Sequence, residues 1–102
     1  MESLTLVLLR RPAEPPVLPE EEADRIQEAH LAFLDRLRQD GVMGAAGPFR
    51  DQDDELLRGL CVYRVDIDEA RRHAAEDPAV RAGVLKAEAI TWWFREGEIT
   101  LG

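Results

Sequence analysis

The sequence has 102 residues, with 21 acidic and 13 basic side chains and a formal net charge of −8. A chain of this length predicts one domain, residues 1–102, large enough to fold without disulfides, and its acidic balance opposes binding to nucleic acid, which needs clustered positive side chains. No apolar run reaches the ~18 residues of a membrane span and the start lacks the basic region of a secretory signal, so we expect a cytoplasmic protein that binds no membrane.

The first part of the chain predicts a strand followed by a long helix. Residues 3–10 form a nearly continuous apolar run that is too short for an ordinary helix, so we expect a strand buried on both faces. Four prolines within residues 12–19 stiffen a connection without secondary structure. A helix is then expected from about residue 20 to residue 40, where Gly41 ends it.

The middle of the chain predicts a hairpin. Two apolar stretches, residues 42–49 and 56–65, are separated by an acidic loop at residues 50–55. In the second stretch apolar side chains occupy both alternating sets, so this strand has two apolar faces and needs a cover on each. The single cysteine, Cys61, has apolar neighbours, which favours inert packing over a metal or nucleophile site.

A second helix and a last strand complete the pattern. A capping box begins the helix, which is expected over residues 66–76. His73 lies on it beside two arginines, which indicates a solvent-facing position. The last strand covers residues 84–94, and because Trp92 and Trp93 point to opposite faces, we expect one in the core and the other at a pocket or a dimer interface.

These elements predict an α+β fold. Their order, strand-helix-strand-strand-helix-strand, is that of the ferredoxin-like βαββαβ arrangement, with one antiparallel sheet and both helices on one face. The strands indicate that the opposite face is apolar as well. We therefore expect a homodimer, in which a twofold partner stacks its own sheet on that face to form a dimeric α+β barrel.

One histidine lies where a polar side chain is least expected. On a helix, His30 shares a face with Ile26 and Leu37, so its imidazole points toward the buried side. A buried imidazole needs a hydrogen-bond partner, and histidine can give or take a proton near neutral pH. The pattern is compatible with a proton-transfer residue and with a core histidine satisfied by one hydrogen bond.

Three stretches of the chain follow one another as a pattern: His30-Leu31, Ala46-Gly47-Pro48, and Asp77-Pro78 followed by Ala82-Gly83-Val84. Together they resemble the YciI-like (YCII-related) family of small α+β dimers. The resemblance covers nearly the whole chain and implies that His30 and Asp77 form a catalytic pair at a pocket. One departure is the last strand, where the family usually has a proline followed by an aromatic residue and this chain has Trp92-Trp93.

For each of the other candidate site residues, a purely structural role is the alternative to a functional one. The proline after Asp77 holds the backbone extended and is expected to expose the carboxylate, although a turn or helix-stop role is the alternative. Gly47 and Pro48 could let a ligand approach the backbone or could only end a strand. Arg10 could hold a substrate carboxylate or lie solvated on the surface, and Trp92 is the aromatic candidate for the pocket. No metal-ligand set, phosphate loop or nucleophile motif is found, so no metal and no cofactor are expected.

The leading hypothesis is a small cofactor-independent enzyme of lyase or isomerase type. In it, His30 and Asp77 would transfer a proton on a small organic acid or aromatic. The alternative is a non-catalytic dimeric module that binds a metabolite or a protein. The fold of the family is also shared with muconolactone isomerases and small monooxygenases, so fold alone does not decide the chemistry.

Overall fold

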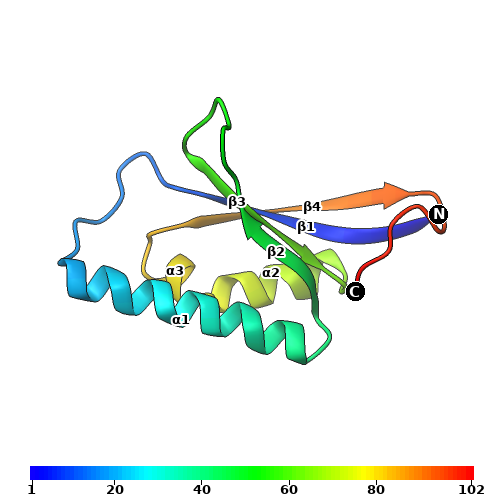
Figure 1. Cartoon of the computed structure of the whole chain (residues 1–102), viewed down its shortest axis with the longest axis horizontal. Coiled ribbons are helices and arrows are strands. Elements are labelled where there is room, and N and C mark those ends of the chain that lie inside the picture. The colour runs from blue at the N-terminus through cyan, green and yellow to red at the C-terminus, as the bar shows by residue number, and fades with distance from the viewer.

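The computed structural model describes residues 1–102, which form a four-stranded antiparallel sheet with three helices on one face (Figure 1). The elements are β1 (Glu2–Arg10), α1 (Glu20–Gln39), β2 (Met43–Pro48), β3 (Leu57–Tyr63), α2 (Ile67–Glu76), α3 (Pro78–Arg81) and β4 (Lys86–Phe94). The strand order is β2-β3-β1-β4, and every neighbouring pair is antiparallel. The ferredoxin-like α+β fold expected from the sequence is confirmed.

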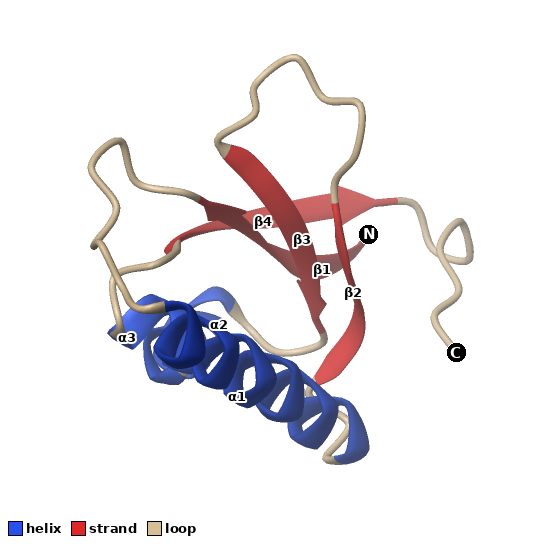
Figure 2. Cartoon of the chain, turned by 60° about the vertical axis from the view of Figure 1, so that its left-hand side comes forward, coloured by secondary structure: helices blue, strands red, loops and turns tan.

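Figure 2 shows the helices and the sheet as two layers, and the core residues come from the facing sides of both. The buried residues of α1 are His30, Phe33, Leu34 and Leu37, which is the helical spacing expected from the sequence. Phe33, Leu34 and Leu37 pack with side chains of β1 and β3 in a single cluster. On α2 the buried residues are both alanines, whose small side chains let this helix lie close to the sheet.

One helix was not expected from the sequence. Pro78 does not only end α2 but begins α3, since a proline at the first helical position loses no hydrogen bond. Asp77 closes one helix and caps the next, where its side chain accepts a hydrogen bond from the Ala79 N–H at 2.9 Å. This capping turns the carboxylate inward, so the expectation of an exposed Asp77 is wrong: the residue is only 2% exposed.

No helix covers the face of the sheet turned away from α1, α2 and α3, and the C-terminal residues Leu101 and Gly102 lie only at its β2 and β3 edge. By strand alternation this face carries Leu4, Leu6, Leu8, Leu60, Val62, Ile90, Trp92 and Phe94, which we call the outer sheet face. Ile90 and Trp92 are 42% and 39% exposed, and the Trp92 and Phe94 rings contact each other with centroids 5.3 Å apart. A second apolar face, as expected from the sequence, is therefore present.

Two aromatic residues and one histidine lie elsewhere than expected. Neither Trp92 nor Trp93 packs in the core, because β4 is an edge strand whose end extends beyond the helices. His73 is not fully solvent-facing: its ring stacks on Tyr63 with centroids 6.3 Å apart, and only 28% of its side chain is exposed. None of the helices combines the length and apolar character that crossing a membrane requires.

Candidate functional site

A histidine of α1 and an aspartate between α2 and α3 meet at the inner side of α1. Nδ1 of His30 lies 2.9 Å from Oδ1 and 2.8 Å from Oδ2 of Asp77, although 47 positions separate the two residues in the sequence. His30 lies in the middle of α1, and Asp77 occupies the junction of α2 and α3. Both side chains are buried, so the pair is shielded from bulk water.

The contact fixes which ring nitrogen is available for chemistry. An ionised carboxylate only accepts hydrogen bonds, so Nδ1 donates to Asp77 and carries the proton of the neutral ring. Nε2 has no hydrogen-bond partner in the protein. Every fully buried side-chain nitrogen and oxygen does have a partner, so Nε2 must be reachable from outside. On this side of the helix, His30 lines a cavity between α1 and the sheet.

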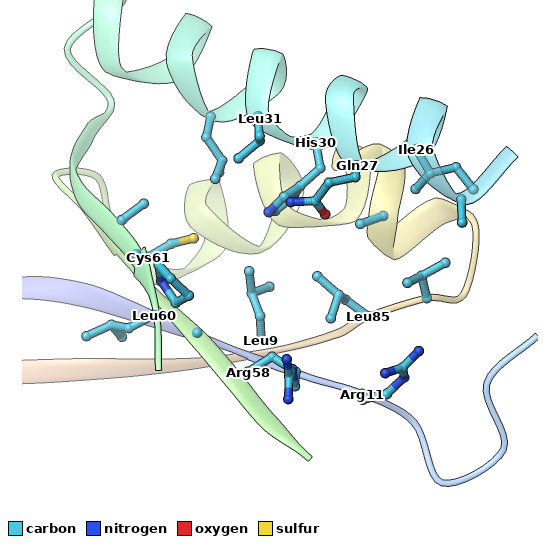
Figure 3. Close-up of a pocket in the computed structure, with 18 of the residues that line it drawn as sticks. Leu9, Arg11, Ile26, Gln27, His30, Leu31, Arg58, Leu60, Cys61 and Leu85 are labelled. Atoms are coloured by element: carbon cyan, nitrogen blue, oxygen red, sulfur yellow. The ribbon is translucent and has the colours of Figure 1, made fainter. Parts of the chain in front are cut away.

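This cavity has a volume of about 670 Å³ and is lined by His30, Gln27 and apolar side chains of the sheet and of the segment after α3 (Figure 3). Leu9, Leu60 and Leu85 lie on the side opposite α1. A third wall comes from the connection between β1 and α1, which contributes Pro15, Pro16 and Leu18. The space is large enough for a small organic molecule beside the imidazole.

The structure brings some of the expected site residues to the cavity and separates others from it. Gly47 and Pro48 line the cavity together with His30. Asp77 does not line it and contacts it only through His30. The expectation that both members of the pair face the solvent-accessible pocket is therefore correct for His30 alone.

Two expected binding residues lie outside the cavity. Arg10 is on the surface, where its guanidinium lies 2.9 Å from Asp54 and 3.5 Å from Glu88, and the hydrogen bond to Asp54 raises the pKa of Arg10. Trp92 belongs to the outer sheet face. Strand alternation explains both positions, because Arg10 and Trp92 point away from the helices. Sequence reasoning missed Arg11 and Arg58, which do line the cavity.

Cys61 also lines the cavity, and its surroundings make it a poor nucleophile. The thiol is free and buried, and burial raises its pKa to about 12, with a smaller contribution from the negative charge of Asp77. A thiol with this pKa keeps its proton near neutral pH, and only the thiolate is strongly nucleophilic. The thiol of Cys61 is therefore a poor candidate for nucleophilic chemistry near neutral pH.

The raised pKa of Cys61 predicts a loss of stability in alkaline solution. The folded protein keeps the thiol proton at pH values where the unfolded chain has lost it, so the free energy of unfolding falls as pH rises from 9 toward 12. The expected slope for one group is up to ~1.4 kcal/mol per pH unit. Chemical denaturation at a series of pH values measures it, and Cys61→Ala should flatten the curve between about pH 9 and 10, below the ordinary range of tyrosine. An unchanged slope in the variant would contradict this cause.

No group of three or more His, Cys, Asp or Glu side chains lies close enough together to hold a metal ion.

Comparison with known proteins identifies a matching family and several similar structures. The family model of the YCII-related domain matches residues 5–94. Among solved structures, 5-chloro-2-hydroxyhydroquinone dehydrochlorinase (TftG) from Burkholderia phenoliruptrix AC1100, in complex with 2,5-dihydroxybenzoquinone, matches with a TM-score of 0.58 and 21% identity over 93% of this chain and 96% of that one. A mutant of SnoaB, a cofactor-independent oxygenase from Streptomyces nogalater, matches with a TM-score of 0.50 and 21% identity over 96% and 98% of the two chains. A comparison with curated proteins finds no match.

Proposed function

Because the chain belongs to the YCII-related domain family, we propose that it is a small cofactor-independent enzyme in which His30 and Asp77 transfer a proton on an organic ligand. The observation that carries the proposal is the contact of both Asp77 oxygens with Nδ1 of His30, while Nε2 remains reachable from the cavity. The two similar structures support small-molecule chemistry on this fold, since one is a dehydrochlorinase and the other an oxygenase.

The pair has the geometry of an oriented general base. Nε2 would take a proton from an acidic C–H or O–H of the ligand, and the ring would become an imidazolium. The Asp77 carboxylate, held by both Nδ1 of His30 and the Ala79 N–H, would stabilise that positive charge without moving. Returning the proton to another ligand atom gives an isomerase, and losing a leaving group from the ligand carbanion gives a lyase.

The outer sheet face supports a homodimer as part of the same proposal. Eight apolar side chains on one face of a sheet form a surface that a second copy could cover with its own outer sheet face. Such a twofold contact would leave the cavity, on the helix side of the sheet, open to ligands. A cytoplasmic location and the lack of nucleic-acid binding remain predictions from the sequence.

The tautomer of His30 tests the proposed pair directly. In ¹⁵N-labelled protein in mildly alkaline solution, the ring nitrogens of His30 should show a proton on Nδ1 and a bare Nε2. Asp77→Asn should change this pattern, because an amide can donate to Nδ1 as well as accept from it. His73, the only other histidine, provides the internal control, and His73→Gln assigns the two sets of signals. A proton found on Nε2 of His30 in the wild type would contradict the proposed base.

A further inference from the structure

Two arginines line the side of the cavity that is opposite α1 (Figure 3). Arg11 directly follows β1, and its backbone N–H donates to the Leu56 carbonyl at 2.7 Å, which ties it to the start of β3. Arg58 is the second residue of β3, and its Nη1 donates to the Glu55 carbonyl at 3.1 Å. The two arginines therefore come from neighbouring strands of the sheet, and both line the cavity.

A β-bulge accounts for the position of Arg58. Leu9 pairs with Gly59, but Arg10 pairs with Leu57, so Arg58 is an extra residue without a partner on β1. Gly59 faces the helices as Leu9 does, and regular alternation would turn its neighbour Arg58 to the outer sheet face. The bulge interrupts this alternation, and Arg58 lines the cavity instead.

The charge of the cavity is opposite to that of the whole chain. Its lining contains three arginines and one acidic residue, and the third arginine, Arg38, lies 3.5 Å from that acid, Asp35. Neither Arg11 nor Arg58 forms an ion pair. Both therefore keep guanidinium N–H donors free, in a protein whose 21 acidic side chains outnumber its 13 basic ones.

We infer that the ligand of this cavity is an aromatic or alicyclic carboxylate, with its anionic group on Arg11 and Arg58. The inference rests on the proposed function, because it names the ligand class for the same cavity. Arginine presents a planar set of donors that matches the two oxygens of a carboxylate. Leu9 and Leu85 would contact the apolar body of the ligand, and its far end would lie toward Nε2 of His30 across the cavity.

A pair of probes with the same shape and different charge tests this inference. 1-Naphthoate and 1-naphthamide share the apolar ring system, and only the first carries a negative charge. Titration calorimetry should show that the wild type binds naphthoate at least about tenfold more tightly than naphthamide, as expected for charge-assisted hydrogen bonds from two arginines. Raising the salt concentration should reduce the difference, because both arginines are partly exposed to solvent.

Variants show whether the two arginines cause the preference. In Arg11→Gln/Arg58→Gln the two probes should bind with nearly equal affinity, and each single variant should lose part of the preference. Arg72→Gln removes one charge from an exposed position on α2 and should keep the wild-type preference. Equal affinities in the wild type, no naphthoate binding at millimolar concentration, or a full preference in the double variant would overturn the inference.

The carboxylate site and the proposed general base can fail independently of each other in these experiments. His30→Gln should keep the preference for naphthoate, because the charge is recognised on the other side of the cavity. A preference for naphthoate together with a proton on Nε2 of His30 would uphold the carboxylate site and overturn the proposed base. A proton on Nδ1 of His30, together with equal binding of the two probes, would uphold the proposed base and overturn the carboxylate site.

Discussion

His30→Gln is expected to lower proton transfer to a bound ligand by about 10²–10⁴-fold, the contribution typical of a positioned general base. Glutamine can still hydrogen-bond to Asp77, but it has no nitrogen that takes a proton in place of Nε2. The measurement is the rate at which solvent deuterium enters an acidic C–H of hydroxyquinones and cyclic keto acids, followed by NMR. The aromatic and carboxylate classes are chosen to match the cavity.

Two further variants show how a lower exchange rate in His30→Gln is to be interpreted. Asp77→Asn should also lower the exchange rate, since it removes the charge that stabilises the imidazolium. His73→Gln is the matched control, because His73 contacts Glu69 and Tyr63 outside the cavity, and its exchange rate should equal that of the wild type. Thermal melting checks that each variant folds.

An exchange rate in His30→Gln equal to that of the wild type would contradict the proposed general base. His30 would then be a buried residue whose hydrogen bond to Asp77 is structural. A wild type that binds the carboxylates but exchanges no proton on any of them would instead favour the non-catalytic binding module.

A charge on the outer sheet face is expected to separate the proposed homodimer into monomers. Light scattering of the wild type should give about twice the chain mass of 11.5 kDa, and Ile90→Arg should give the mass of one chain. Ile90 is 42% exposed in the single chain, so arginine fits the monomer, whereas an apolar interface would have to bury an unpaired guanidinium.

The matched control places the same charge on a helix. Ala75→Arg lies at an exposed position of α2, on the other side of the sheet, and should leave the dimer intact. A wild type that is monomeric at micromolar concentration, or a dimer unaffected by Ile90→Arg, would contradict an interface on the outer sheet face.

The sequence predicted most of the fold because its apolar periods agree with the elements that form. The helical spacing around His30 identified the buried face of α1, and the apolar residues on both sides of the strands revealed the uncovered sheet face. The partner of His30 could not be predicted from apolar spacing. Asp77 was found through the family resemblance, since nothing in the spacing of 47 residues indicates a contact.

The errors have local physical causes. The burial of Asp77 depends on α3, a four-residue helix too short to have a periodic pattern of its own. Arg58 was missed because a bulge shifts strand alternation by one residue, and its position appears only when the pairing of β1 with β3 is known. Arg10 was chosen in place of its neighbour Arg11 because the sequence does not show on which side of the sheet the cavity lies.

The cavity is built from two parts of the chain that can change independently of each other. His30 and Asp77 are fixed by helices packed on the sheet, whereas the wall formed by Pro15, Pro16 and Leu18 belongs to no helix or strand. Connecting segments of this kind accept insertions, deletions and substitutions at little cost to the rest of a fold. Chains with this architecture can therefore diverge toward ligands of new size by altering one connection, while the contact between His30 and Asp77 is inherited unchanged.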